Sequence, residues 1–171
     1  MDKTNVKAEF VILGDKFDPQ IITDNLKIIP TRCWTKEIDK RPYVLPPNPE
    51  NLVRIKDSDL RKIVQEHDGS SSENKHRPRP KIKHDFSRWD IETGYQESTN
   101  INIQINQIYQ ILKNKINILK KLKPKYALDY RLVIVINVED NEKPGMCFDH
   151  YIIDFLHEIR AIIDIDMYIY S

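Results

Sequence analysis

The architecture starts from residues 7–15, which read KAEFVILGD. Ala8 and Phe10 fall on one side of an extended chain and Val11 falls on the other, because successive side chains of a strand point to opposite faces. Large apolar residues therefore occupy both sides. The segment predicts a strand over about residues 6–13 that is half to fully buried and that ends at the glycine which follows.

Working outward from this strand, the sequence alternates between helical and extended patterns. Asp18 and Pro19 predict the start of a short helix, because an aspartate side chain caps free N–H groups and proline fits the first helical position. A second strand is expected over residues 31–38. Farther along, the spacing of apolar residues predicts a strand within 86–95, a helix over 101–122 ended by Pro124, a strand within 131–140, a helix over 150–160 and a strand within 162–171.

Residues 39–87 differ in character from the rest of the chain. They hold six of the ten prolines and the polar run GSSSENKHRPRPK at 69–81. Such a stretch carries too little apolar surface to offset the entropy lost on ordering. We therefore expect a single domain over residues 1–171, with 39–87 as a long, proline-rich and partly flexible insertion.

The predicted order of elements is β-α-β, the insertion, β-α-β and then α-β. This order predicts an α+β fold with a ferredoxin-like β-α-β-β-α-β core and an added helix and strand. The sheet is expected to be mostly antiparallel, with helices on one face. Trp34, Trp89 and Phe155 are predicted to lie in the core, together with the alternate apolar residues of the last strand, Ile163, Ile165, Met167 and Ile169.

Composition and charge exclude several classes of protein. The 171 residues carry 27 basic and 26 acidic side chains, a near-balance that argues against a dedicated nucleic-acid binder. No apolar run approaches the roughly 20 residues that span a bilayer, and the first ten residues do not resemble a secretory signal. Two cysteines make no disulfide framework, so we expect a cytoplasmic protein. The 26 isoleucines and 18 lysines suggest an AT-rich bacterial or phage genome.

Three segments resemble one protein family. They are FVILGDKFDPQIITDNLKIIPTRCW at 10–34, RWDIET at 88–93 and FLHEIRAIIDIDMYIYS at 155–171. Together they are similar to a bacterial family of domains of unknown function, DUF4279, and they leave 39–87 as a long departure from it. The resemblance implies a small cytosolic protein without assigned activity, of a kind in which some members are suspected toxin-immunity proteins. It implies no catalytic residues.

Few residues suggest catalysis or cofactor binding. His150, Asp154 and His157 share one face of a predicted helix, a spacing compatible with a metal, but one helix supplies no fourth ligand. Cys33 and Cys147 have no evident neighbouring base. Cys33, next to Trp34, is better explained as a small buried apolar residue. Gly14 belongs to no phosphate-binding motif. We therefore expect no cofactor and no metal.

The candidate site is a group of acidic and aromatic residues on two strands. If the apolar sides of the strands face the helices, the opposite side of the sheet presents Asp90, Glu92, Asp164, Asp166, Tyr168 and Tyr170. Carboxylates on neighbouring strands repel one another unless basic groups cover them. The group is either the solvent-exposed face of a sheet that is covered by helices on its other face, with the basic insertion covering part of it, or a docking face for a basic partner.

These observations favour a non-enzymatic, cytosolic protein-binding module. The most specific version is an immunity protein or inhibitor that neutralises a toxin or a host or phage factor, acting as a monomer or a small homo-oligomer. One alternative is a small carboxylate- or metal-dependent hydrolase that uses His150 or His157. Another is nucleic-acid contact through the basic run at 75–84, which the absence of interleaved aromatic residues disfavours.

Overall fold

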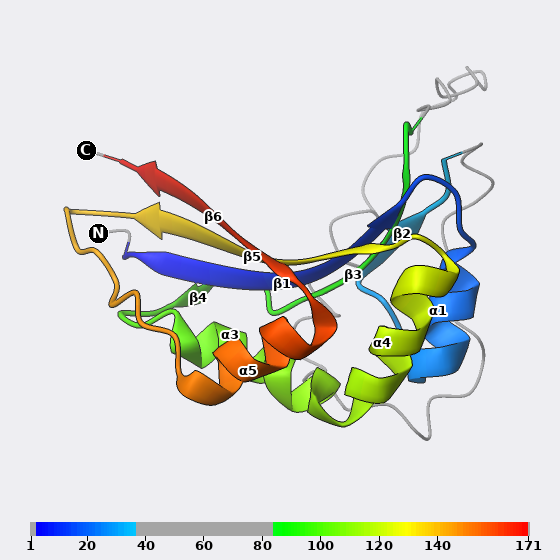
Figure 1. Cartoon of the computed structure of the whole chain (residues 1–171). Coiled ribbons are helices and arrows are strands. Elements are labelled where there is room, and N and C mark those ends of the chain that lie inside the picture. The colour runs from blue at the N-terminus through cyan, green and yellow to red at the C-terminus, as the bar shows by residue number, and fades with distance from the viewer. Residues whose placement is uncertain (1–2, 37–83, 171) are drawn as a thin grey trace, which may run out of the picture.

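The computed structural model describes residues 3–36 and 84–170. Within these ranges the chain forms a six-stranded sheet and four α-helices (Figure 1). The elements are β1 (Asn5–Gly14), α1 (Pro19–Leu26), β2 (Arg32–Trp34), β3 (Ser87–Glu92), β4 (Gln96–Glu97), α3 (Asn102–Leu112), a 3₁₀ turn (Lys113–Lys115), α4 (Ile116–Lys125), β5 (Asp129–Val138), α5 (His150–Ile159) and β6 (Ile162–Ile169).

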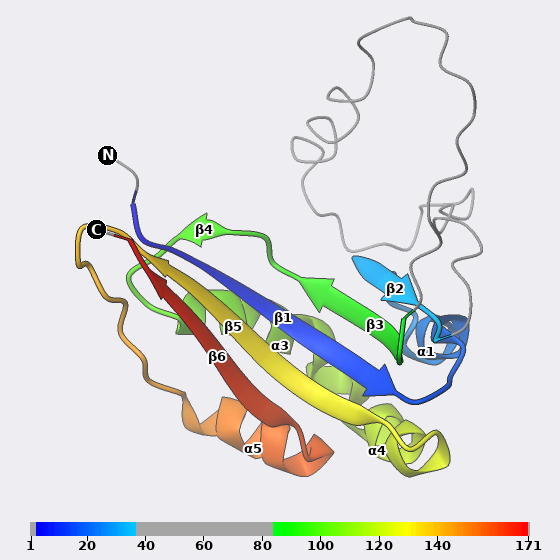
Figure 2. The same cartoon turned by 90° about the horizontal axis from the view of Figure 1, so that it is seen from above.

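The sheet is mostly antiparallel. Its strand order is β2-β3-β1-β5-β6, and the short β4 pairs with the beginning of β1 (Figure 2). β1 runs antiparallel to both β3 and β5, and β2 runs antiparallel to β3. Only β6, which follows the α5 crossover, is parallel to its neighbour β5. The predicted α+β class and the mostly antiparallel sheet are confirmed.

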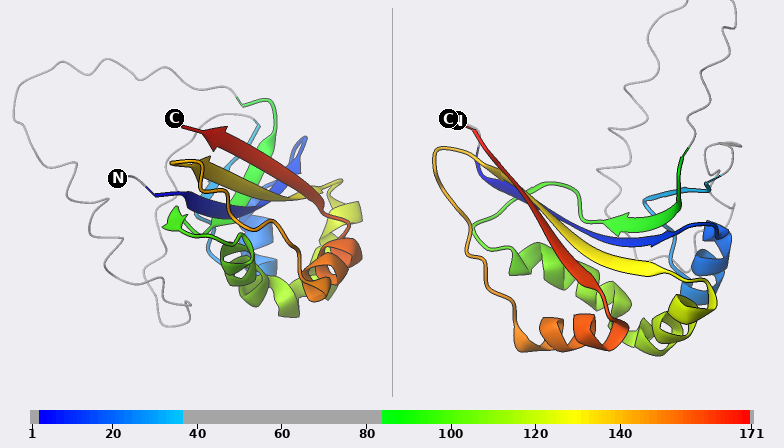
Figure 3. Two further views of the ribbon diagram at one scale, coloured as in Figure 1. Left: turned by 90° about the vertical axis from the view of Figure 1, so that its left-hand side faces the viewer. Right: turned by 45° about the horizontal axis from the view of Figure 1, so that its top comes forward.

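The four helices of the described residues lie on one face of the sheet, as expected (Figures 1 and 3). Phe10 and Ile12 of β1 point into this layer and are fully buried, as are Ile134 and Ile136 of β5. The other face of the sheet, here called the open face, is concave in Figure 1 and carries no helix of the described residues. Alternation along β1 therefore sends one set of side chains into the core and the other set onto the open face.

The helix predicted over 101–122 is two helices. A 3₁₀ turn at Lys113–Lys115 separates α3 from α4, and this bend lets Leu112 and Leu119 both remain fully buried. Pro124 lies inside the last turn of α4 and does not end it at residue 122. The proline removes only one backbone donor there, and the N–H of Tyr126 still reaches Leu122.

The second and third strands also differ from the prediction. Within the described part of the strand expected over 31–38, only residues 32–34 form a strand, β2, and residues 37–38 lie outside the described residues. β3 begins at Ser87, inside the range assigned to the insertion, of which residues 39–83 also lie outside the described residues. β4, with two residues, was not predicted, because two residues give no periodic pattern.

Trp89 and Phe155 are core residues as predicted, but Trp34 is not. Cys33 is paired with Trp89 across the β2–β3 ladder, so the next residue, Trp34, points to the open face. There its ring stacks on His84 with 4.6 Å between ring centroids, and the guanidinium of Arg88 lies 5.2 Å from it.

The prediction that the last strand buries its apolar row is also wrong. Ile163, Ile165, Met167 and Ile169 are 39%, 36%, 37% and 56% exposed. β6 is the edge strand of the sheet, and its C-terminal half rises away from α5 (Figure 1). The alternating pattern was correct for a strand, but no described element covers this part of it.

We predict that Trp89→Ala lowers the free energy of unfolding by about 3–5 kcal/mol. The indole is fully buried, and its Nε1 donates a hydrogen bond of 3.0 Å to Thr23 Oγ1 in α1. Chemical denaturation measures the change. Trp34→Ala is the matched control and should cost about 1 kcal/mol, because this ring is partly exposed. Equal losses in the two variants would contradict the assignment of Trp89 to the core.

Candidate functional site

The open face of the sheet brings the predicted site residues together. Residues opposite one another on neighbouring strands share a face, and Glu9 of β1 lies opposite Glu92 of β3 and Val133 of β5. Val133 in turn lies opposite Asp164 of β6. By alternation, the same face carries all six predicted residues, which are Asp90, Glu92, Asp164, Asp166, Tyr168 and Tyr170.

The six residues fall into two environments. Asp90 and Glu92 lie in an inner cluster of ionised side chains on β1, β2 and β3. We define this inner cluster as Lys7, Glu9, Arg32, Arg88, Asp90 and Glu92. The other four predicted residues lie on β6 or, for Tyr170, directly after it, at the opposite side of the face. We call Asp164, Asp166, Tyr168 and Tyr170 the outer patch.

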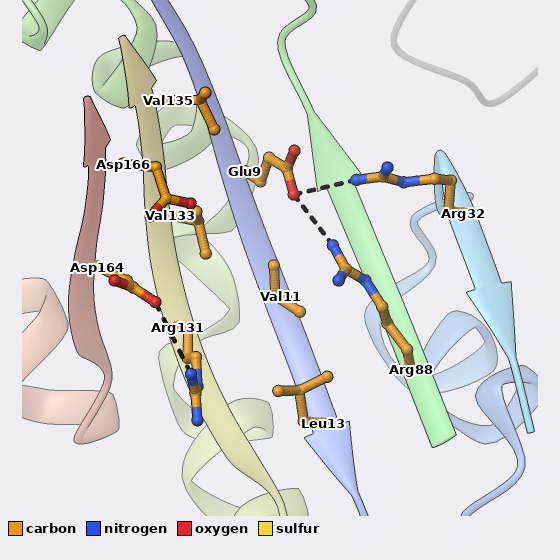
Figure 4. Close-up of a pocket in the computed structure, with 10 residues that line it drawn as sticks. All are labelled: Glu9, Val11, Leu13, Arg32, Arg88, Arg131, Val133, Val135, Asp164 and Asp166. Atoms are coloured by element: carbon orange, nitrogen blue, oxygen red, sulfur yellow. Dashed lines mark hydrogen bonds and ion pairs between the residues drawn. The ribbon is translucent and has the colours of Figure 1, made fainter. Parts of the chain in front are cut away.

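The inner cluster is a network of ion pairs centred on Glu9. Its carboxylate lies 3.0 Å from both Arg32 Nη2 and Arg88 Nη2 (Figure 4) and 2.5 Å from Lys7 Nζ. Arg32 also pairs with Asp90 at 3.3 Å and with Glu92 at 3.2 Å. Three basic and three acidic side chains thus neutralise one another on this part of the face.

Asp90 is the most enclosed member of the network. Its side chain is fully buried, and its two oxygens accept hydrogen bonds from Arg88 Nε and Arg32 Nε. A buried carboxylate held in this way stabilises the pairing of β2 with β3 and presents no oxygen to solvent. Glu92, whose side chain is 23% exposed, is also paired, with Lys7 and Arg32.

The network shifts the pKa values of Glu9 and Lys7. Burial by itself would raise the pKa of Glu9, but the hydrogen bond and charge of Lys7 and the charges of Arg32 and Arg88 outweigh it, so the pKa lies below its usual value. Burial would lower the pKa of Lys7, yet its contact with Glu9 raises it. These groups are ionised at neutral pH and are poor candidates for proton transfer.

The outer patch is exposed and acidic. Tyr168 and Tyr170 are 51% and 50% exposed, and the side chain of Asp164 is 47% exposed. Asp164 and Asp166 point from β6 toward β5 (Figure 4), where Arg131 Nη1 lies 3.8 Å from Asp164. One basic side chain therefore faces two carboxylates, and the patch keeps a net negative charge.

A shallow depression of about 340 Å³ lies between the inner cluster and the outer patch. Val11, Val133 and Val135 form its floor, and charged side chains from both sides surround them (Figure 4). Apolar atoms ringed by charges suit contact with another molecule's side chain.

The basic side chains of the open face were not predicted from the sequence. Lys7, Arg32, Arg88 and Arg131 pair with the acidic residues. Partial cover by the basic insertion was one of the two alternatives, and residues 39–83 of that insertion lie outside the described residues. The signal was present in part, because Lys7 and Glu9 alternate with the core residues of β1 and so had to face the same side as the predicted carboxylates.

The residues considered for metal binding or nucleophilic catalysis do not form such sites in the described part of the chain. His150, Asp154 and His157 are exposed on α5, and the described residues hold no group of three or more His, Cys, Asp or Glu side chains that could bind a metal. Burial, with the charges of Asp90 and Asp18, raises the pKa of the Cys33 thiol, which disfavours its nucleophilic thiolate form. Within residues 3–36 and 84–170, no helix is both long and apolar enough to cross a membrane.

Comparison with known proteins identifies the family. The sequence model described as "Domain of unknown function (DUF4279)" matches residues 4–51 and 65–170. The chain belongs to this family. The match to DUF4279 includes residues 39–51 and 65–87, so the expected departure over 39–87 is limited to 52–64. Comparisons with curated proteins and with solved structures gave no match.

We predict that the ion pairs of Glu9 make this DUF4279 protein sensitive to acid. Because the folded-state pKa of Glu9 is below the ordinary 4.5, the ion pairs contribute fully above pH 4.5, and their contribution is lost as the pH falls through the lowered pKa. Glu9→Gln should lower the free energy of unfolding at pH 7 by about 2 kcal/mol. In this variant the free energy of unfolding should also decrease less as the pH is lowered. Urea denaturation over a pH series measures both effects.

Glu97→Gln is the matched control for this prediction. Glu97 pairs with Lys3 at 2.7 Å, but its side chain is 62% exposed. Exposed pairs contribute little, so this variant should follow the acid dependence of the unmodified protein. Identical pH curves for Glu9→Gln and Glu97→Gln would show that the inner cluster does not stabilise the fold.

Proposed function

We propose that this protein is a non-enzymatic protein-binding module whose outer patch docks onto a basic surface of its partner. The proposal rests on a difference in charge between the two parts of the open face. The inner cluster is paired and neutral, whereas the outer patch combines two carboxylates with two half-exposed tyrosines beside a depression with an apolar floor. Tyrosines surrounded by polar groups are typical of binding surfaces.

The proposed partner is a toxin, or a host or phage factor, that the protein neutralises. The family resemblance supports this class of partner, and the small net charge of +1 means that steering comes from the local negative charge of the outer patch. Two unpaired cysteines support the proposed cytoplasmic location. The order β2-β3-β1-β5, with each neighbouring pair antiparallel, supports a ferredoxin-like core to which α5 and β6 are added.

The two alternative functions have less support. A carboxylate-dependent hydrolase needs an acid or base free to exchange protons, yet Glu9, Asp90 and Glu92 are held by arginine and lysine. Nucleic-acid contact was assigned to the basic run at 75–84, of which only His84 lies within the described residues, stacked on Trp34.

We predict that Asp164→Lys and Asp166→Lys together weaken partner binding by about a hundredfold or more, because they replace attraction with like-charge repulsion. The partner is captured from cells with the unmodified protein and purified, and binding kinetics are then measured at several salt concentrations. The loss should appear mainly in the association rate and should diminish as salt screens the charges.

The control is a double variant with the same change of charge on the helical side of the molecule. Asp24→Lys with Asp154→Lys alters two exposed aspartates on α1 and α5 and should leave affinity unchanged. Thermal melting establishes that both double variants are folded. A partner that binds the Asp164, Asp166 variant with unchanged affinity would overturn the proposal.

A further inference from the structure

The outer edge of β6 is long, and no described element covers it. β6 has eight residues and ends the sheet, so in the described part of the chain nothing pairs with its outer backbone groups. Natural edge strands are usually short or carry lysine, proline or a bulge that prevents pairing. The opposite edge follows this rule, since β2 has three residues and begins with Arg32. β6 contains no lysine and no proline.

The direction of the backbone groups on β6 follows from one hydrogen bond. The N–H of Tyr170 donates to the carbonyl of Val138 at 2.9 Å, so the backbone of Tyr170 points toward β5. In a strand these groups alternate in direction. The N–H and C=O groups of Ile165, Met167 and Ile169 therefore point outward.

The side chains of the same residues are apolar and exposed. Ile165, Met167 and Ile169 lie on the helix side of the sheet and are 36%, 37% and 56% exposed. An added strand would pair with the outward backbone groups of β6 and would cover the row of apolar side chains beside them.

We propose that β6 pairs with β6 of a second copy of this chain, antiparallel and centred on Met167. Antiparallel pairing about a two-fold axis keeps the helices of both copies on one side of a continuous sheet, so residues that face each other must lie on the same side. The axis therefore lies between the two strands and is level with a residue of β6. An axis level with a peptide bond would place Ile165 opposite Asp166, which lies on the other side of the sheet.

Electrostatics excludes two of the registers that remain. An axis through Asp166 would place this carboxylate against its own copy, and an axis through Ile165 would place Asp164 against Asp166 of the second copy twice. Like charges directly opposite one another destabilise a sheet. Both registers bring together the acidic half of the strand.

An axis level with Met167 avoids every such pair. An axis level with Tyr168 also avoids them, but only the Met167 register places both aspartates opposite tyrosines. Asp166 then faces Tyr168 of the second copy, and Asp164 faces Tyr170 of the second copy, so each phenol can donate to a carboxylate. On the helix side Met167 meets its own copy and Ile165 meets Ile169 of the second copy. The acidic first half and the aromatic second half of β6 are thus complementary to each other in the antiparallel sense.

This inference does not rest on the proposed function. The pairing uses the strand edge, the helix side of β6 and the phenol–carboxylate contacts of the outer patch, and it leaves the depression on the open face uncovered in both copies. A partner that binds the outer patch would meet two such patches side by side across the axis.

Sedimentation of the full chain over about a hundredfold range of concentration tests the proposal. The unmodified protein should convert from monomer to dimer as its concentration rises. Met167→Lys should weaken dimerisation at least about tenfold, because two ammonium groups then meet at the axis. The matched control, Ile103→Lys, makes a similar apolar-to-lysine change on α3 at a side chain that is 51% exposed, and it should dimerise normally. Monomer at every concentration, or equal effects of the two lysines, would overturn the proposal.

Single cysteines test the register without a destabilising charge. In a background of Cys33→Ser and Cys147→Ser, the substitutions Ile165→Cys, Met167→Cys and Ile169→Cys are compared under mild oxidation. Only Met167→Cys should form a disulfide-linked dimer, because the other two positions lie about 13 Å from their own copies in this register. Preferential linkage at residue 165 or 169 would overturn it. Partner binding by monomeric Met167→Lys would separate this proposal from the proposed function.

Discussion

The register of β1 determines where every charged side chain of the sheet lies. β1 is paired on both sides, with β3 and β4 at one edge and with β5 at the other. A slip of one residue against its neighbours would move Phe10 onto the open face and Glu9 into the core, and every alternate residue would follow. The fully buried Phe10 and the triply paired Glu9 therefore specify the same register from opposite faces.

Arginine and lysine make the open face of the inner strands possible. Glu9, Asp90 and Glu92 lie close together, and three carboxylates on adjacent strands would repel one another without Lys7 and the two arginines. Because the charges cancel, this half of the face stabilises the packing of the inner strands. The uncompensated charge of the face lies on β6, where Arg131 is the basic neighbour among the described residues.

The α5–β6 addition gives one strand two different surfaces. On the open face β6 carries the outer patch, and on the helix side it carries an apolar row that α5 leaves partly exposed. Since successive side chains alternate, the apolar row that a second copy would cover and the outer patch lie on opposite sides of the strand. Both proposals therefore depend on β6, and substitution of Met167, which lies outside the outer patch, separates them.

The sequence by itself determined the α+β class, the core strands around Phe10 and Ile134, the buried Trp89 and the shared face of the six predicted residues, because all of these follow from local periodicity. It did not determine which strand lies at the edge, and so the apolar row of β6 was assigned to the core. Nor did it reveal that Asp90 is enclosed by two arginines that lie 58 and two residues away from it. Burial and ion pairing depend on which strands become neighbours, and that is decided by long-range pairing in the tertiary structure and not by the spacing of residues within one strand.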